Sequence, residues 1–492
     1  MLGIINEHIN FQVSPGQPSS ISDDAEVFTL VGSDHDAANL VNQKEIHWGL
    51  FEDSLGERLE TAGGRTMDSD KADGEVKDGE LEENKKRSVD GGKGSSTQKK
   101  LKKDKVVAAT GKASRSESSI ATGAPRVKPE LTLPIIPAEV EHSILEDLRN
   151  RVQLSSMTLP SISFYTFINT HNGLNCASIS HGGSLVAGGF SDSSLKVWDT
   201  AKLGQQTGNS SLQGENELAP NDNILNANAK GRSYTLFRGH SGPVYSATFS
   251  PFGDFLLSSS SDSTIRLWST KLNSNLVCYK GHNYPVWDVQ FSPLGHYFAS
   301  ASHDRTARIW SMDRIQPLRI MAGHLSDVDC VQWHANCNYV ATGSSDKTVR
   351  LWDIQSGECV RIFIGHRSMI LSLAMSPDGR YMASGDEDGK IMMWDLASGR
   401  CVSPLVGHSS CVWSLSFSCE GSLLASGSAD STVKIWDVTR SSKVSKSEEH
   451  KNGNTNRLRS LKTLPTKSTP VYALQFSRRN LLFAAGALTK IA

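Results

Sequence analysis

Five histidines recur between residues 240 and 408 at a constant spacing of 42 residues, each directly after a glycine. A serine or threonine, an aspartate and a tryptophan follow each histidine in the same register. Imidazole, carboxylate and hydroxyl are the groups of a nucleophilic triad, in which the imidazole activates the hydroxyl. The sets are His240, Ser258, Asp262, Trp268; His282, Ser300, Asp304, Trp310; His324, Thr342, Asp346, Trp352; His366, Ser384, Asp388, Trp394; and His408, Ser426, Asp430, Trp436.

Repetition of the set disfavours catalysis, because a hydrolase needs one exposed, activated nucleophile rather than five copies. Indole, hydroxyl, imidazole and carboxylate can instead form one chain of hydrogen bonds, and each buried polar group left unpaired would cost ~1 to 3 kcal/mol. We therefore expect a structural role for these residues and no catalytic residue. The five histidines fall in different units, beyond the ~2 Å reach of a shared metal ion.

The repeat also predicts the fold. A period of about 40 to 45 residues with Gly-His and Trp-Asp signatures is typical of a four-stranded WD40 propeller blade. Two weaker units extend the count to seven: Asp192 with Trp198, followed by an insertion at 204–231, and Pro470–Phe476, preceded by an insertion within 439–460.

The ends of the repeat region predict how the ring closes. The last unit stops after two strand-like runs, and another such run, 162–168, precedes the first unit. An open sheet edge invites aggregation, so pairing of the two ends in one blade is favoured. We predict an all-β fold: a seven-bladed WD40 β-propeller at 159–492, closed by N- and C-terminal strands.

Three further regions precede the propeller. Residues 1–60 are expected to be a partial helical region, with an amphipathic helix carrying Trp48, Phe51, Leu55 and Leu59. Residues 61–130 are rich in Gly, Ser and charged residues and predict a disordered linker. Helical spacing returns within 131–158, which predicts a helix docked on the propeller.

Composition narrows the class of protein. The net charge of -1 gives no bulk attraction to nucleic acid, and no run approaches the ~18 apolar residues of a membrane span. The eight cysteines lack CxxC spacing, which disfavours zinc knuckles and disulfide frameworks. We expect a protein inside the cell, without cofactor, metal, membrane contact or small-molecule substrate.

A binding function must then come from surface positions that differ between units. Four aromatic residues at the start of the inner strands, beside an acidic sector, suit a protein partner. The alternative is that these aromatics only pack the blades. The candidate protein-binding face comprises Tyr245, Trp287, His303, Asp327, Asp329, Glu387, Trp413 and Tyr472.

Two basic clusters lie in the linker, separated by an eleven-residue spacer. Such an arrangement predicts a bipartite nuclear-localisation signal or a nucleic-acid contact, with a solvated charge run that extends the linker as the alternative. The clusters are Lys85, Lys86, Arg87 and Lys99, Lys100, Lys102, Lys103.

Four segments together resemble the WD-repeat subunit five family of the general transcription factor TFIID. They are LPSISFYTF (159–167), RGHSGPVYSATFSP (238–251), GHNYPVWDVQFSP (281–293) and KSTPVYALQFSRRNLLFAAGAL (467–488). The resemblance implies a nuclear scaffold that holds histone-fold subunits in an initiation complex, and in some relatives in a histone-acetylating coactivator. Promoter DNA would be contacted indirectly, through the complex.

The resemblance departs from the family at the N-terminus. Family members begin with a LisH motif and a complete helical domain, whereas Met1 here falls within what resembles the end of that domain. We therefore expect an N-terminally shortened chain. The remaining alternatives are another nuclear WD-repeat adaptor, such as a ubiquitin-ligase substrate receptor, and an enzyme of propeller form.

Overall fold

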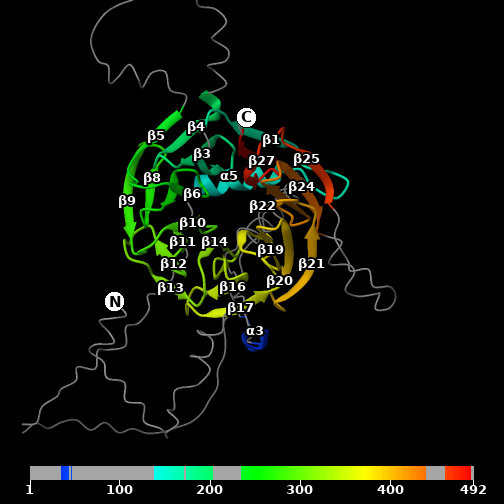
Figure 1. The fold of residues 1–492 in the computed structure, drawn as a ribbon. Helices are drawn as coiled ribbons and strands as arrows, with labels where there is room; N and C mark the ends of the chain where they lie inside the picture. Colours follow the sequence, from blue (N-terminus) through cyan, green and yellow to red (C-terminus); the bar gives the residue numbers. More distant parts are fainter. Residues whose placement is uncertain are drawn as a thin grey trace, which may run out of the picture. The chain divides into compact units, whose positions relative to one another are not determined.

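Seven β-sheets radiate around a common axis in the computed structural model (Figure 1). The structure describes residues 35–43, 46, 138–170, 173–202, 234–438 and 460–488. Six sheets have four strands and the seventh has three. The seven-bladed propeller predicted from the repeat is thereby confirmed.

The blades are numbered here in chain order, with the innermost strand of each named first. Blade 1 contains β2 (Leu174–Ile179), β3 (Leu185–Phe190), β4 (Leu195–Asp199) and β5 (Tyr234–Phe237). Blade 2 contains β6 (Val244–Phe249), β7 (Phe255–Ser260), β8 (Thr264–Ser269) and β9 (Ser274–Lys280). Blade 3 contains β10 (Val286–Phe291), β11 (Tyr297–Ser302), β12 (Thr306–Ser311) and β13 (Arg319–Ala322). Blade 4 contains β14 (Val328–Trp333), β15 (Tyr339–Ser344), β16 (Thr348–Asp353) and β17 (Cys359–Ile364). Blade 5 contains β18 (Ile370–Met375), β19 (Tyr381–Asp386), β20 (Lys390–Asp395) and β21 (Arg400–Val406). Blade 6 contains β22 (Val412–Phe417), β23 (Leu423–Ser428), β24 (Thr432–Asp437) and β25 (Ser460–Pro465). Blade 7 contains β26 (Val471–Phe476), β27 (Leu482–Ala487) and β1 (Ile162–Phe167).

Burial explains the composition of the strands. The second strands of blades 3, 4 and 6 are buried along their whole length, and they consist largely of small residues, as in YFASAS of β11. Small side chains let neighbouring sheets pack closely on both faces of such a strand. The inner strands instead alternate between buried and partly exposed residues, as in β10, because one of their faces lines the centre of the ring.

Every inner strand carries a β-bulge after its first residue. In blade 3 the pairing with β11 shifts between Val286 and Asp288, so Trp287 lies outside the ladder. The same shift occurs in all six other blades. A bulge re-aims the side chain of the extra residue, and this residue occupies one of the positions at which the units differ in sequence.

Strands from the two ends of the repeat region close the ring, which confirms the predicted closure. β1 pairs with β27 from Ile162↔Leu482 to Phe167↔Ala487, and this pairing is parallel. All other strand pairs of the blades are antiparallel. Phe167 at the end of β1 packs edge-on against Trp198 of blade 1, with ring centroids 5.1 Å apart, so the closing strand also joins the first blade.

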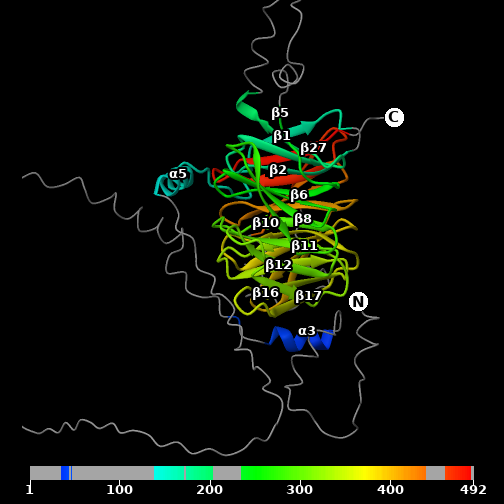
Figure 2. The same cartoon turned by 90° about the vertical axis from the view of Figure 1, so that its left-hand side faces the viewer.

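Among the described residues, two helices contact the ring, one on a face and one on the rim (Figures 1 and 2). α5 (Ala138–Arg149) lies in the segment expected to dock, and its Asp147 accepts a 2.8 Å charged hydrogen bond from Arg479 in the β26–β27 turn. Leu154, just after α5, is buried in the apolar core of blades 6 and 7. The other helix, α3 (His35–Asn42), packs against β17.

Several expectations fall on residues outside those the structure describes. They are the amphipathic helix of Trp48–Leu59, most of the two insertions, and the linker with its basic clusters. None of the helices among the described residues is long and apolar enough to span a membrane.

Candidate functional site

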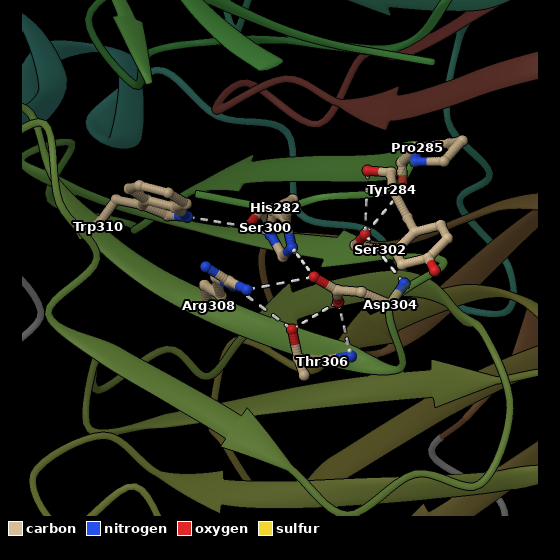
Figure 3. Close-up of polar contacts among 9 residues, drawn as sticks. All are labelled: His282, Tyr284, Pro285, Ser300, Ser302, Asp304, Thr306, Arg308 and Trp310. Atoms are coloured by element: carbon tan, nitrogen blue, oxygen red, sulfur yellow. Dashed lines mark hydrogen bonds and ion pairs between the residues drawn. The ribbon is translucent and has the colours of Figure 1, made fainter. Parts of the chain in front are cut away.

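The repeated polar set of blade 3 forms a continuous chain of hydrogen bonds (Figure 3). Trp310 Nε1 donates to Ser300 Oγ at 2.8 Å, and Ser300 Oγ lies 2.7 Å from His282 Nε2. His282 Nδ1 lies 2.7 Å from Asp304 Oδ2. Indole can only donate, so the hydroxyl proton is free to bond Nε2, and the imidazole proton then sits on Nδ1 and points to the carboxylate. We call this set of four residues a tetrad.

The carboxylate of the tetrad is held from several sides. Thr306 donates to Asp304 Oδ1 through both its hydroxyl, at 2.6 Å, and its backbone N–H, at 3.0 Å, while Arg308 lies 3.3 Å from Oδ2. Burial alone would raise the pKa of Asp304, but the hydrogen bonds that its carboxylate accepts from His282 and Thr306 outweigh burial and lower the pKa to about 2. Burial lowers the pKa of His282. The pair is therefore a neutral imidazole donating to a carboxylate anion.

Blades 2, 4 and 6 repeat this geometry. The histidine Nδ1 to carboxylate distances are 3.0, 2.8 and 2.9 Å, and each tryptophan donates to its hydroxyl at 2.8 Å. All of these hydroxyl residues are 0% exposed. A buried hydroxyl that already accepts an indole proton is unsuited to attack a substrate, so the geometry fits a structural role rather than a triad. The residues are His240, Ser258, Asp262, Trp268; His324, Thr342, Asp346, Trp352; and His408, Ser426, Asp430, Trp436.

In blade 5 the assignment of Asp388 to the repeated polar set is wrong. His366, Ser384 and Trp394 bond as expected, but His366 Nδ1 pairs with Asp386 at 2.8 Å and not with Asp388. Asp386 stands at the end of β19, where the other tetrad blades have a serine, and it is buried, whereas Asp388 is exposed. The buried carboxylate of Asp386 therefore takes the role that the spacing predicts for Asp388.

Two repeated positions escape an analysis based on His, Asp, Ser and Trp alone. The first is the threonine two residues after the aspartate, which donates to Oδ1 at 2.6 Å in blades 2, 3, 4 and 6. The second is the glycine of Gly-His: a Cβ on Gly281 would lie 2.7 Å from Trp310 Cη2. The glycine precedes all five histidines, whereas the threonine recurs in four units and is replaced by Lys390 in the fifth. The 42-residue period is therefore the signal that marks both positions.

The candidate binding residues lie on the face that carries the Gly-His turns, here called the upper face. In blade 3 the turn of His303 meets the start of the inner strand, because His303 N donates to Pro285 O at 3.0 Å. Tyr245, Trp287, Asp329, Trp413 and Tyr472 are the bulge residues of their inner strands. The structure gathers most of the eight candidates into two clusters.

Blades 2 to 4 form the first cluster. The rings of Tyr245 and Trp287 lie 4.8 Å apart, and Trp287 meets His303 edge-on at 6.2 Å. His303 Nδ1 lies 2.6 Å from Asp327 Oδ2. Tyr284, which the sequence analysis overlooked, stacks obliquely on His303 at 5.5 Å and is 54% exposed. The Nε1 atom of Trp287 is buried without a hydrogen-bond partner among the described residues.

Asp329 joins this cluster from blade 4. Ser345 donates to its carboxylate at 2.6 Å. Burial, together with the nearby charges of Asp327 and Asp346, raises the pKa of Asp329 to about 7 despite that hydrogen bond. The acidic sector therefore holds one carboxylate that ionises only near neutral pH.

Blades 6 and 7 form the second cluster, in which the rings of Trp413 and Tyr472 lie 4.8 Å apart. Glu387 is exposed on the turn of blade 5, so its blade separates the two clusters along the ring. The basic clusters at Lys85–Arg87 and Lys99–Lys103 lie outside the described residues. Within the described ranges, no three His, Cys, Asp or Glu side chains are grouped closely enough to hold a metal ion.

Comparison with known proteins gives two results. The family model "WD domain, G-beta repeat" matches residues 163–199, 231–269, 273–311, 315–353, 357–395 and 399–437. Among curated proteins, the chain is 76% identical over 490 residues to "Transcription initiation factor TFIID subunit 5" of Arabidopsis thaliana, covering 100% of this chain and 72% of the relative.

More distant relatives match shorter segments. The Drosophila melanogaster protein of the same name is 42% identical over 138 residues, which cover 27% of this chain and 20% of that protein. "SAGA complex/transcription factor TFIID complex subunit Taf5" of Schizosaccharomyces pombe is 36% identical over 143 residues, covering 29% and 20%.

Proposed function

Because the chain belongs to the TFIID subunit 5 family of WD-repeat transcription initiation factors, we propose that it is a non-enzymatic scaffold of a nuclear RNA polymerase II initiation complex. Its proposed partners are histone-fold subunits of that complex, and it reaches promoter DNA only through them. The name of the S. pombe relative includes both TFIID and SAGA. We therefore extend the proposal to membership of a SAGA-like coactivator complex.

One observation carries the scaffold proposal: the residues that hold the frame are separate from those that vary on the upper face. The tetrads use buried side chains that end at the Gly-His turns. The bulge residues lie outside the ladders, and partly exposed rings gather there. Trp and Tyr contribute strongly to protein interfaces, and a frame that does not depend on them leaves them available to a partner.

The unpaired indole of Trp287 supports the same assignment. A buried N–H without an acceptor costs roughly 1 to 3 kcal/mol. Because this N–H is shielded from the surface in the free chain, a carbonyl or carboxylate of a partner would remove that cost only by drawing the ring outward. Next to it, Asp327 offers negative charge and Tyr284 offers an exposed ring. The first cluster is therefore the part of the upper face that we assign to the main contact.

The test uses single substitutions in the full chain. Trp287→Ala and Trp413→Ala are compared with Leu272→Ala, which removes an exposed apolar side chain from the β8–β9 turn. Circular dichroism checks the fold, and co-purification from nuclear extract measures the recovery of histone-fold subunits. We expect Trp287→Ala to weaken recovery by the equivalent of ~2 kcal/mol or more and Leu272→Ala to leave it unchanged.

Other outcomes would reject specific parts of the proposal. Loss of folding would assign the tryptophans to blade packing. Retained folding with undiminished recovery would move the interface to the blade flanks or the lower face. Recovery of cullin adaptors in place of histone-fold subunits would replace the initiation scaffold with a ubiquitin-ligase receptor.

A further inference from the structure

The edge of blade 4 is occupied by a residue from the N-terminal region, 320 positions away in sequence. Asn42 Nδ2 donates to Ile362 O at 3.0 Å, and Asn42 Oδ1 accepts from Ile362 N at 2.9 Å. β17 is the outermost strand of its sheet, so its outward N–H and C=O groups lack a neighbouring strand. The carboxamide of Asn42 supplies both missing bonds, as a paired strand would.

Apolar contacts accompany this pair of hydrogen bonds. Ala38 and Val41, on one side of α3, are buried against Ile362, with Cys359 and Ile364 packed around them. Leu40, on another side of the helix, is 54% exposed. An isolated helix of eight residues is unstable in water, so α3 owes its structure to docking on β17.

A third contact lies four residues beyond Asn42. Ile46 is partly buried against the apolar core shared by blades 4 and 5, in the company of Val360 and Met375. The contacts of the N-terminal region therefore extend from the outer strand of blade 4 toward blade 5. We call Ala38, Val41, Asn42 and Ile46 the N-terminal clasp.

Blade 5 accommodates the clasp through a glycine. Gly399, in the β20–β21 turn, has φ +69°, and a Cβ there would lie 2.9 Å from Asn42 Nδ2. Gly357 occupies the corresponding turn of blade 4 with φ +76°, but its Cβ would meet only Arg319 Cδ, at 3.8 Å. Both turns need glycine for their backbone. Only Gly399 is also required by the approach of Asn42.

We propose that the flank of blades 4 and 5 is a binding surface for the chain's own N-terminal region, recognised through the clasp. Recognition combines three elements: a carboxamide that pairs with the edge backbone of Ile362, two small apolar residues three positions apart on a helix, and a glycine turn that leaves room for the carboxamide. While the clasp is docked, this flank is closed to other proteins, and the segment around α3 is held at the rim. The inference does not depend on the proposed binding at the upper face.

The principal test measures hydrogen–deuterium exchange at the amide of Ile362 in the full chain, with residue-resolved fragmentation. Asn42→Ala removes the acceptor for that amide, and Gly399→Ala pushes the carboxamide away. Gly357→Ala is the matched control, because it strains an equivalent turn without touching Asn42. We expect exchange at Ile362 to accelerate at least tenfold in the first two variants and to stay unchanged in the third.

Amides far from the N-terminal clasp distinguish undocking of α3 from a general loss of stability. Val277 in β9 of blade 2 should exchange equally in all variants. Equal exchange at Ile362 in Gly399→Ala and Gly357→Ala, or no effect of Asn42→Ala, would overturn the proposal.

A second measurement remains informative if a variant proves unstable. Ala38→Cys, in a Cys401→Ser background, should be joined to the native Cys359 by a short bifunctional thiol reagent, because Ala38 and Cys359 pack in one cluster. Leu40→Cys is the control from the exposed side of the helix, and Cys359→Ser should abolish the product. Equal cross-linking from positions 38 and 40 would show that α3 does not dock in this orientation.

Discussion

Asp386 Oδ2 lies 2.8 Å from His366 Nδ1, although the repeat places the aspartate of the other tetrads two residues later. Two further substitutions accompany this shift. Lys390 stands where the other tetrad blades have a threonine, and Met392 stands where they have arginine or lysine. Lys390 donates its backbone N–H to Asp386 Oδ1 at 2.8 Å, so the new carboxylate keeps the backbone bond and loses the hydroxyl bond.

The first prediction contrasts the two aspartates of blade 5. Asp386→Ala should leave the buried imidazole of His366 without its acceptor and destabilise the protein by ~1 to 3 kcal/mol. Asp388→Ala, at an exposed position, should change stability by less than about 0.5 kcal/mol. Thermal unfolding followed by circular dichroism measures both, and a larger loss for Asp388→Ala would restore the assignment made from spacing.

The second prediction concerns stability in mild acid. Burial lowers the pKa of His282, His324 and His408 in the folded state. Between those values and the ordinary histidine pKa near 6.5, the unfolded chain binds more protons, so the free energy of unfolding falls as pH falls. We expect a lower melting temperature at pH 5.5 than at pH 7.5. An unchanged or higher value at pH 5.5 would contradict neutral, buried imidazoles.

The third prediction has the opposite pH dependence. Asp329, with its pKa raised to about 7, holds its proton in the folded state at pH values where the unfolded carboxyl has lost it. Its burial therefore costs stability increasingly as pH rises from about 3.8 to 7. Asp329→Asn should stabilise the protein by on the order of 2 kcal/mol at pH 8 and by less at pH 5. Melting temperatures of both proteins at the two pH values test this, and equal gains would refute it.

Asp329→Asn also gives a clearer test of the pH dependence that we assign to the buried histidines. In this variant residue 329 no longer titrates. The difference in melting temperature between pH 7.5 and pH 5.5 should therefore grow, because the opposing contribution of the Asp329 carboxyl is gone. A smaller difference would show that the sign assigned to Asp329 is wrong.

The fourth prediction tests the glycine of the Gly-His pair. A Cβ on Gly281 would lie 2.7 Å from the buried ring of Trp310 and 3.0 Å from Arg308 Nη1. Gly281→Ala should therefore shift the ring or the turn and destabilise the protein by ~1 to 3 kcal/mol. Gly182→Ala is the control, since a Cβ there meets nothing within 4 Å. Similar melting temperatures for the two variants would show that the turn relaxes without cost.

The fifth prediction concerns import into the nucleus. Replacing Lys99, Lys100, Lys102 and Lys103 with alanine should reduce nuclear accumulation of a fluorescent fusion, because a bipartite signal needs both basic clusters. Alanine replacements at Ser95, Ser96 and Thr97, in the spacer between the clusters, serve as the control. Unchanged accumulation of the lysine variant would assign the run to the linker or show that partners carry the chain in.

The sequence by itself determined the blades. Within a blade, each strand pairs with the next one along the chain through a short turn, so residues such as His282, Ser300, Asp304 and Trp310 meet through local hairpins. Period and residue type are sufficient for such contacts, because antiparallel neighbours with fixed register bring fixed spacings together. The seven units followed from that regularity, and the candidate face was chosen from the positions at which the units differ. Closure of the ring was predicted separately, from the unpaired strand-like runs at the two ends of the repeat region.

Tertiary structure alone decided the contacts between segments distant in sequence. The parallel pairing of β1 with β27, the seat of Asn42 on Ile362 and the division of the aromatic candidates into two clusters have no local periodic signature. Blade 5 shows the same limit within a repeat: Asp386 and Asp388 are equally good carboxylates in sequence, and only the burial of one beside His366 selects between them. Such choices depend on which groups lose water together, and that is determined by packing in three dimensions.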